Sequence, residues 1–308
     1  MNNKGKICIS DKQISKCHEA MVQSIRLSEV AMAVGLSEST IQKTLDIAVA
    51  ESLQTLSLLQ NLEFEIGDRM LEVGAGYGLA SICLALMGFE VTALEPGGIG
   101  FEENRQASVA FADACGVVIS HISESAETFD FSETDKFKLI LSNNVLEHIP
   151  DFNRALTNLN NALASDGIMV HSCANYAFPF EPHFHIPLLP IVPQFTWKLL
   201  PNTTVESGLW QSLNFIKFSQ IKRNVHRNQM SCKFRCGTMR KSIRRLRLDQ
   251  EFSKRHGGLA RLVRFSPFFY LLMLGASLPR RIATPMDFLI CFPQQQKSKN
   301  VQTWISQR

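Results

Sequence analysis

The sequence predicts an α/β fold: a doubly wound, mostly parallel sheet, preceded by a helical cap and followed by a helical, basic extension. Three observations support this prediction. From about residue 65 to residue 173, short apolar runs alternate with helix-like segments, as expected for parallel strands joined by crossover helices. A glycine-rich turn at 74–78 separates the first strand from the first helix. Residues 1–60 have apolar residues at helical spacing and lack the alternation of a β-strand.

The N-terminal part contains two predicted helices, 28–36 and 40–59. Gly35 lies between them, so this segment is similar to a helix-turn-helix motif. However, the segment lacks the basic face that contact with nucleic-acid phosphates requires. We therefore interpret it as a cap of helices over a ligand site.

The elements after the cap follow from the spacing of apolar residues. Strands are expected at 69–73, 89–94, 117–121, 137–142 and 168–173, helices at 79–87, 101–114 and 153–163, and a turn at 166–167. After residue 175, six prolines interrupt an aromatic-rich segment, which predicts a long lid with short helices at most. An edge strand is expected at 286–292, and residues 294–308 are expected to be frayed.

These elements predict three parts: a helical cap at 1–60, a ligand-binding core at 61–175, and a lid with a basic extension at 176–308. With 45% hydrophobic and 19% charged residues, the composition is that of a globular protein. The eight cysteines are scattered, which indicates free thiols in a reducing compartment. No secretion signal is recognisable at the N-terminus. We therefore predict a cytoplasmic protein, with a peripheral position at the inner membrane face as an alternative.

The glycine turn carries information about its ligand. The pattern from Glu72 to Gly78 is acid-x-Gly-x-Gly-x-Gly, and Leu79 occupies the position where a dinucleotide-binding turn has its third glycine. A carboxylate beside the turn disfavours a pyrophosphate and suits a ligand that carries an ammonium group and a sulfonium. Glu95, at the end of the second strand, is placed to accept two ribose hydroxyls.

The sequence here resembles the class I S-adenosylmethionine-dependent methyltransferases, especially the domains called methyltransferase type 11 or type 23. The resemblance rests on LEVGAGYG at 71–78, Glu95, the segment at 123–127, and FKLILSNNVLEHIP at 137–150. It implies a Rossmann-like core with S-adenosyl-L-methionine as cofactor. The implied cofactor-binding residues are Glu72, Gly74, Ala75, Gly76, Gly78, Glu95, Pro96, Ser125, Ala126, Asn143 and Asn144. Two departures from the family pattern are Ser125 and Lys138, which replace aspartates that are common at these positions.

Three histidines are candidates for work on the methyl acceptor: His148, His183 and His185. His148 follows the fourth core strand, where either a catalytic role or a role in packing the next helix fits. Glu181, His183 and His185 lie on the lid, and their spacing is compatible with acceptor binding, with hydrogen bonds that anchor the loop, or with metal ligation. We predict no metal here, since a third ligand on the same side would have to come from elsewhere.

The segment at 217–278 combines many lysines and arginines with a neighbouring apolar stretch. Such a segment suits an anionic membrane surface or an anionic acceptor, or it forms a solvated face. The absence of interleaved aromatic residues disfavours nucleic acid as a partner.

The leading functional hypothesis is a methyltransferase that acts on a hydroxyl or carboxyl group of a small-molecule acceptor, with glycosyl and lipid-linked acceptors included. The alternative is a non-catalytic DNA-binding or scaffold protein that retains a nucleotide-binding fold. The intact glycine turn and its two acids favour the enzyme.

Overall fold

The computed structural model describes residues 5–97, 102–131, 136–184, 186–248, 269–270, 273 and 280–307. The strands are β1 (Lys6–Cys8), β2 (Glu63–Glu65), β3 (Arg69–Val73), β4 (Glu90–Leu94), β5 (Ser120–Ile122), β6 (Phe137–Asn143), β7 (Leu163–Cys173), β8 (Phe180–Glu181), β9 (Ile186–Pro187), β10 (Ser231–Phe234) and β11 (Met286–Cys291). The longer helices are α1 (Asp11–Ser24), α2 (Leu27–Val34), α3 (Glu38–Ser57), α4 (Leu79–Leu86), α5 (Glu102–Ala114), α6 (Phe152–Ala162), α9 (Phe218–Arg227), α10 (Thr238–Leu248) and α14 (Lys299–Ser306). The shorter helices are α7 (Asn202–Val205), α8 (Gly208–Ser212) and the 3₁₀ helices η1 (Leu146–His148), η2 (Pro193–Leu199) and η3 (Pro293–Lys297).

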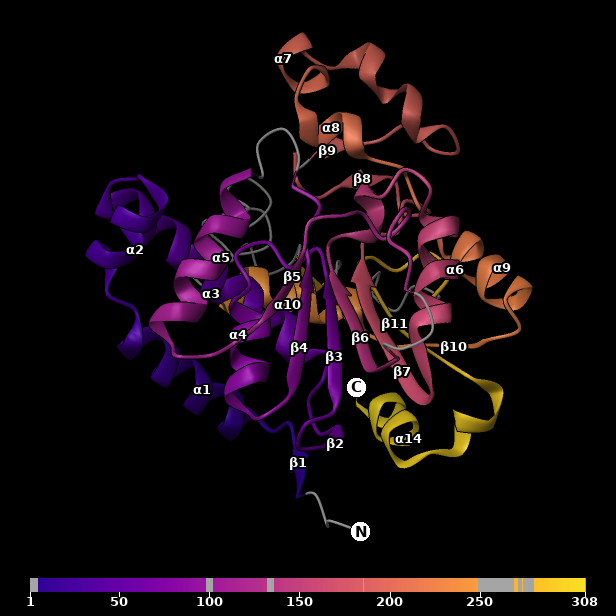
Figure 1. Ribbon diagram of the computed structural model, residues 1–308. Helices are drawn as coiled ribbons and strands as arrows, with labels where there is room; N and C mark the ends of the chain where they lie inside the picture. Colours follow the sequence, from indigo (N-terminus) through magenta and orange to yellow (C-terminus); the bar gives the residue numbers. More distant parts are fainter. Residues whose placement is uncertain are drawn as a thin grey trace.

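The central sheet has seven strands in the order β10-β11-β7-β6-β3-β4-β5 (Figure 1). The strands from β7 to β5 are parallel, and β11 and β10 add antiparallel pairs at one side. Helices lie on both sides of the sheet (Figure 1). The predicted fold class, a doubly wound, mostly parallel Rossmann-like sheet with an N-terminal helical cap, is therefore confirmed.

Side chains that alternate along each strand divide the core between the two faces of the sheet. Leu139 and Leu141 of β6 pack with the N-terminal helices, α4, α5 and α14. Ile140, between them, packs with α6, α9 and the lid. Strands covered on both faces are apolar at almost every position, which is why the core strands could be located from the sequence.

The N-terminal helices pack against the helices of the core. α1 and α3 lie against α4, and α2 lies against α5. Gly35 ends α2 with a left-handed backbone (φ 74°), and Ser37 caps α3 by accepting the N–H of Thr40. The short strand β1, which pairs with β2, was not predicted, because three residues are too few to show an alternating pattern.

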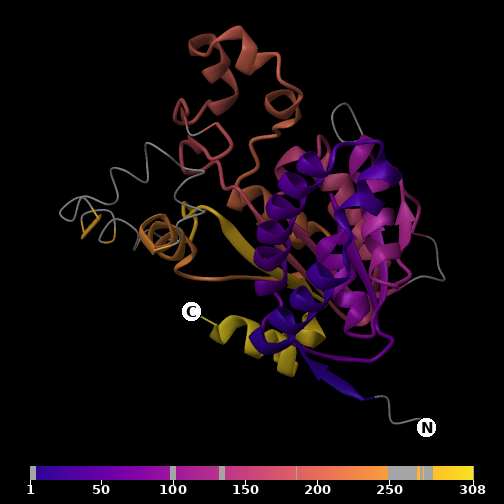
Figure 2. The same cartoon turned by 90° about the vertical axis from the view of Figure 1, so that its left-hand side faces the viewer.

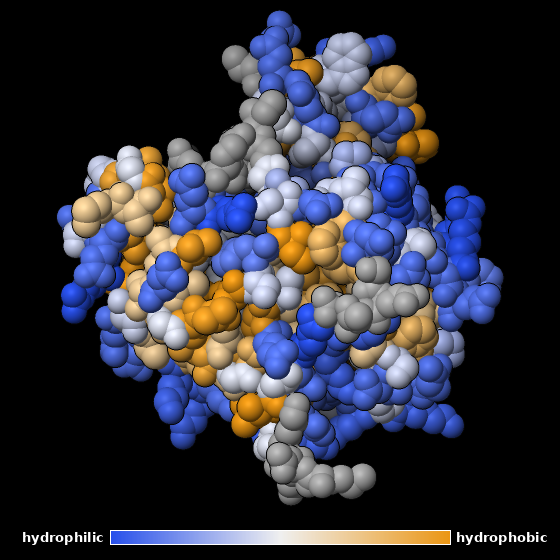
Figure 3. Space-filling view, viewed as in Figure 1, coloured by the Kyte–Doolittle hydropathy of each residue, from blue (hydrophilic) through white to orange (hydrophobic). Residues whose placement is uncertain are grey.

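The lid, residues 176–216, projects above the carboxyl ends of the parallel strands (Figures 1 and 2). It contains the small β8–β9 hairpin and the short helices η2, α7 and α8, as the prolines of this segment indicate. Large apolar side chains, including Ile191, Trp197 and Leu199, are exposed on it, and Figure 3 shows hydrophobic residues on its outer surface.

Three predicted elements in the core and its extension need correction. The third core strand begins at Ser120, later than the predicted start at 117, because it pairs only with Thr92–Leu94 of β4. The turn predicted at 166–167 is part of β7, which begins at Leu163 and pairs with β6 across a register shift. β11 is not an edge strand, since it lies between β7 and β10.

The C-terminal segment is ordered, so the prediction of frayed residues at 294–308 is wrong. Trp304 of α14 is fully buried, and its Nε1 donates a hydrogen bond to the carbonyl oxygen of Leu58, 3.0 Å away. The guanidinium of Arg235 stacks on the Trp304 ring at 4.3 Å and donates a hydrogen bond to the same Leu58 carbonyl. These contacts join the end of the chain to the end of α3. They explain why one cation of the predicted basic segment is buried rather than solvated.

Much of the apolar and basic stretch at 217–278 falls on positions 249–268, 271–272 and 274–279, outside the described residues. Among the helices that the structure describes, none combines the length and the apolar character that a membrane crossing needs.

We expect Trp304→Ala to lower the free energy of unfolding by about 3–5 kcal/mol, because it removes a fully buried ring and leaves a cavity. Urea denaturation would measure the change. The matched control is Ile305→Ala, at the adjacent and partly exposed position, which should cost much less. Equal losses in the two variants would contradict the anchoring role of Trp304.

Candidate active site

The glycine turn follows β3 and leads into α4. Gly74, Gly76 and Gly78 all have positive φ, at 67°, 52° and 71°, a conformation that other residues rarely adopt. A Cβ on Gly74 would lie 2.4 Å from Cγ2 of Val145, so the turn lies against the segment that follows β6. A Cβ on Gly76 would meet nothing within 4 Å. The turn is therefore closely packed at Gly74 and open at Gly76.

Two carboxylates flank this turn. Glu72, in β3, is buried and accepts a hydrogen bond from Ser81 Oγ at 2.5 Å. Burial, with a smaller contribution from the charge of Glu95, raises the pKa of Glu72 to about 7 against the effect of the Ser81 hydrogen bonds. Glu95 follows β4, and its Oε2 accepts the N–H of Gly76 at 2.7 Å. Burial also raises the pKa of Glu95, while hydrogen bonds from the backbone at Gly76 and Gly97 lower it.

The end of β6 supplies two asparagines. The Nδ2 of Asn143 donates a hydrogen bond to Thr55 Oγ1 of α3 at 3.2 Å, and its Oδ1 is buried with no hydrogen-bond partner in the part of the chain that the structure describes. Asn144 is exposed and has a left-handed backbone (φ 55°), and its N–H donates to the carbonyl oxygen of Ser172. Val145, which follows, precedes η1 and lies against Gly74, so η1 begins beside the glycine turn.

The other implied cofactor residues lie at neighbouring strand ends. Pro96 is exposed directly after Glu95, and Ala75 lies in the turn, with its N–H directed to the carbonyl oxygen of Leu94. Ser125 and Ala126 follow β5; Ser125 Oγ lies 3.0 Å from Thr128 Oγ1, and Ala126 is buried. All the implied cofactor residues therefore come from the carboxyl ends of β3, β4, β5 and β6 or from the turns after them.

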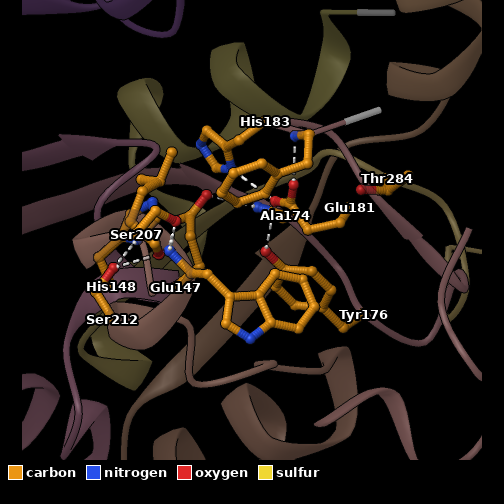
Figure 4. Close-up of polar contacts among 12 residues, drawn as sticks. Glu147, His148, Ala174, Tyr176, Glu181, His183, Ser207, Ser212 and Thr284 are labelled. Atoms are coloured by element: carbon orange, nitrogen blue, oxygen red, sulfur yellow. Dashed lines mark hydrogen bonds and ion pairs between the residues drawn. The ribbon is translucent and has the colours of Figure 1, made fainter. Parts of the chain in front are cut away.

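A second group of polar side chains lies where the lid meets η1 (Figure 4). Glu147 is fully buried, and its Oε1 accepts the N–H of Ala174 at 3.2 Å. The imidazoles of His148 and His183 are in edge contact, with ring centroids 5.0 Å apart. His183 Nδ1 lies 2.6 Å from Oε1 of the fully buried Glu181. We call Glu147, His148, Glu181 and His183 the lid cluster.

Further contacts fix the lid cluster in place. Ser212 Oγ of α8 lies 2.8 Å from His148 Nδ1. Glu181 also accepts hydrogen bonds from the Tyr176 hydroxyl at 3.3 Å and from the N–H of Phe184 at 2.7 Å. Figure 4 shows that these side chains come from η1, from α8, from β8 and from the segments on either side of β8.

Burial dominates the electrostatics of the lid cluster. It raises the pKa of Glu147 to about 7, and it lowers the pKa of His148 to about 4 with a further contribution from the charge of His183. Burial would also lower the pKa of His183, but the hydrogen bond to Glu181 and the charges of Glu181, Glu147 and Glu51 reverse the shift and raise it. The cluster thus holds carboxylates in a site from which much of the water is excluded.

Of the three histidines predicted to act on the acceptor, the structure brings two together, His148 and His183; His185 lies outside the described residues. Sequence reasoning overlooked Glu147, although it precedes His148 in the quoted VLEH motif, because a buried glutamate after a strand gives no periodic signal. Ser212 and Thr55 were also overlooked, since they reach the site from distant parts of the chain.

Two further histidines and two phenylalanines have contacts that indicate structural roles. His171 is fully buried in β7, with Nδ1 2.8 Å from Ser142 Oγ. His121 bonds to Ser108 and to the carbonyl oxygen of Ile119. The rings of Phe129 and Phe131 stack edge to face at 4.6 Å.

A cleft of about 220 Å³ lies at the opposite end of the sheet, between β1, β2 and α14. Charged pairs border it, Lys138 with Asp166 and Lys299 with Glu63. It is located at the amino ends of β3 and β6, and ligands of this type of sheet bind at the carboxyl ends. We therefore do not assign it to the candidate site.

Comparison with known proteins gives a consistent result. The sequence model of a family described as a methyltransferase domain matches residues 42–229, which is more than half of the chain. An uncharacterized protein of Mycobacterium tuberculosis is 31% identical over 198 residues, which cover 62% of this chain and 67% of that protein. A ubiquinone biosynthesis O-methyltransferase of Paramagnetospirillum magneticum is 32% identical over 109 residues, which cover 35% of this chain and 41% of that enzyme.

Among solved structures, the chain is similar to phosphoethanolamine N-methyltransferase 2 of Haemonchus contortus, in complex with phosphomonomethylethanolamine and S-adenosylhomocysteine. The TM-score is 0.46 at 15% identity, and the match covers 78% of this chain and 51% of that enzyme. The chain therefore spans about half or less of the characterised enzymes named here.

The two glycines that differ in their surroundings should respond differently to substitution. Gly74→Ala would combine a positive φ with a clash against Val145, and we expect a loss of about 2–5 kcal/mol in the free energy of unfolding. Gly76→Ala, the matched control, retains only the backbone cost of about 1–2 kcal/mol. Urea denaturation would measure both, and an equal effect would contradict the close approach of the turn to Val145.

Proposed function

This chain belongs to the class I S-adenosylmethionine-dependent methyltransferase family, and we propose that it transfers the methyl group to a hydroxyl of a small-molecule acceptor held at the lid cluster. The observation that carries the proposal is the position of this cluster. Glu147 and His148 follow the β6 end directly, and the β6 end lies against the glycine turn through Val145. An acceptor at the lid cluster would therefore be beside a cofactor at the turn.

The residues at the turn fit the cofactor. The space above Gly76 would admit the methionine part, and the buried carboxylate of Glu72 suits its ammonium group. Glu95 accepts the N–H of Gly76 at the end of β4, where its carboxylate would accept the hydroxyls of a ribose. The buried, unpartnered Oδ1 of Asn143 would accept a donor from the ligand.

When bound, S-adenosylmethionine would supply a methyl group on a sulfonium: the acceptor oxygen would form a C–O bond as the C–S bond breaks, the electron pair would remain on the neutral thioether, and the hydroxyl proton would pass to the imidazole of His148 or His183. The protein has to align the two reactants and exclude water. The lid covers the strand ends, and it is attached to η1 by Asn214, whose Nδ2 donates to the carbonyl oxygens of Leu146 and Ile149 at 2.6 and 2.7 Å. His148 and His183 are proposed to bind and activate the acceptor oxygen.

Charge favours a hydroxyl over a carboxyl acceptor, although the sequence left both open. Glu147 and Glu181 are each fully buried at the lid cluster, and a carboxylate acceptor beside them would be repelled. That the relative from Paramagnetospirillum magneticum is named an O-methyltransferase also supports an oxygen acceptor. The proposed hydroxyl acceptor can be glycosyl or lipid-linked. The proposal also includes an anionic lipid surface as a binding partner of the protein.

The cofactor assignment predicts a pH dependence. Glu72 has a pKa of about 7, raised by burial, and its carboxylate form attracts the cofactor's ammonium group. As the pH falls from 7 to 6, Glu72 takes up a proton and loses this charge, so the affinity for S-adenosylmethionine should weaken by about fivefold. Calorimetric titration would measure it, and Glu72→Gln should bind weakly with a flat profile. Binding of NAD in place of S-adenosylmethionine would contradict the cofactor assignment.

The acceptor assignment predicts a separation of binding from turnover. His148→Ala and His183→Ala should each lower kcat by about a hundredfold or more, while the calorimetric affinity for S-adenosylmethionine stays unchanged. Transfer of radiolabelled methyl to a panel of phenols, catechols and sugar hydroxyls would provide the assay. His226→Ala, at an exposed histidine of α9, is the matched control. Unchanged turnover in both cluster variants would show that the acceptor binds elsewhere.

A further inference from the structure

We infer that Glu147, His148 and His183 form a binding site for one divalent transition-metal ion such as Zn²⁺. Each of these side chains offers one potential ligand atom, and the three atoms lie within 4.8 Å of one another. Ligands of a tetrahedral Zn²⁺ stand roughly 3.3 Å apart, so side-chain adjustments of about an ångström would close the site. The ligands come from η1 and from the lid between β8 and β9, so the ion would join these two segments.

The hydrogen bonds around His148 leave its Nε2 free to act as a ligand. Ser212 Oγ already donates its hydrogen to the carbonyl oxygen of Leu209 at 2.8 Å. With its hydrogen directed to that carbonyl, the hydroxyl oxygen accepts the bond from His148 Nδ1, which then carries a hydrogen. In a neutral ring with the hydrogen on Nδ1, Nε2 presents its lone pair.

The surroundings of His183 have the same effect. Its Nδ1 donates to the carboxylate of Glu181 at 2.6 Å, which leaves Nε2 as the ligand atom. A histidine that donates its other ring N–H to a carboxylate is the arrangement by which proteins commonly orient metal ligands. Glu181 already accepts three hydrogen bonds, from His183 and Tyr176 at Oε1 and from the N–H of Phe184 at Oε2, and it is not one of the three residues whose ligand atoms lie within 4.8 Å of one another.

Glu147 provides the third ligand and an independent indication of a missing partner. It is fully buried, its Oε1 accepts the N–H of Ala174, and its Oε2 is buried with no hydrogen-bond partner among the described residues. A buried carboxylate oxygen without a partner is costly, and a cation at this point would remove that cost. The orphaned oxygen belongs to the same residue whose carboxylate lies beside the two histidines.

The donor set indicates the class of ion. Two imidazole nitrogens and one carboxylate oxygen suit Zn²⁺ and related first-row divalent ions, whereas Mg²⁺ and Ca²⁺ prefer sites made of oxygen atoms. Three protein ligands also leave coordination positions open, as in catalytic rather than structural zinc sites. This site differs from the Glu181, His183 and His185 set considered from the sequence, in which Glu181 is the orienting residue.

An acceptor hydroxyl would then bind at an open position of the ion, and this part of the inference rests on the proposed function. The binding of the ion itself does not. His148 and His183 would act on the acceptor as ligands of the ion rather than as free bases.

The test uses the full-length chain, treated with a chelator, dialysed, and titrated with Co²⁺ and Zn²⁺. We expect one ion per chain, with visible absorption bands of Co²⁺ bound by nitrogen and oxygen, and no comparable binding of Mg²⁺. Glu147→Gln and His183→Asn should each weaken the affinity by at least about a hundredfold, and Ser212→Ala by about 10–100-fold. His226→Asn is the matched control, because this exposed imidazole lies outside the cluster.

Three outcomes would overturn the inference: no stoichiometric binding to the wild-type chain, binding that Glu147→Gln and His183→Asn leave unchanged, or bands of thiolate-bound Co²⁺ in place of the expected ones. Ser212→Ala keeps the test valid if a ligand variant fails to fold, since it removes only one hydroxyl. Full methyl transfer in the presence of chelator would also refute the role of the ion while the proposed function stands. Failure to bind S-adenosylmethionine would refute the proposed function while the ion site stands.

Discussion

The candidate site depends on one constraint: acidic side chains are buried at the carboxyl ends of the parallel strands. Glu72, Glu147 and Glu181 are almost inaccessible to solvent, and burial raises the pKa of the first two to about 7. A folded protein can retain such groups only where hydrogen bonds, protons or cations compensate them. The protein supplies part of this compensation through Ser81, the N–H of Ala174 and His183. The part of the negative charge that these groups leave uncompensated would attract ligands with positive charge to this edge of the sheet.

The sheet brings these acids together, and distant segments complete their surroundings. α3 contributes Thr55, which holds the Asn143 amide, and the charge of Glu51, which acts on His183. The C-terminal helix fixes the end of α3 in turn, because Trp304 and Arg235 both donate to the carbonyl oxygen of Leu58. The position of α3 beside the site therefore depends on the packing of α14. A substitution at Trp304 would affect the site through α3 without contacting it.

The sequence was sufficient where a single local pattern determines the structure, and insufficient where distant partners determine it. β3 and the glycine turn were located correctly, since a doubly covered strand and positive φ angles leave clear patterns. The length of β7, the inner position of β11 and the order of α14 depend on pairing and packing with segments far along the chain. In the lid cluster, His148 and His183 were selected for their chemistry. Glu147 and Ser212 became evident only when the fold placed them beside those rings.

The distribution of acids also limits which ligands the site can accept. Glu72 beside the turn opposes a pyrophosphate, whereas a donor with an ammonium and a sulfonium group is attracted. In the acceptor site that we propose, Glu147 and Glu181 would in the same way oppose a carboxylate and favour a neutral hydroxyl or a bound cation. Transfer of the methyl group removes the sulfonium charge that this environment stabilises. The acids therefore favour binding of the charged methyl donor over binding of its neutral thioether product. The same electrostatics that selects the donor thus weakens the affinity for the product.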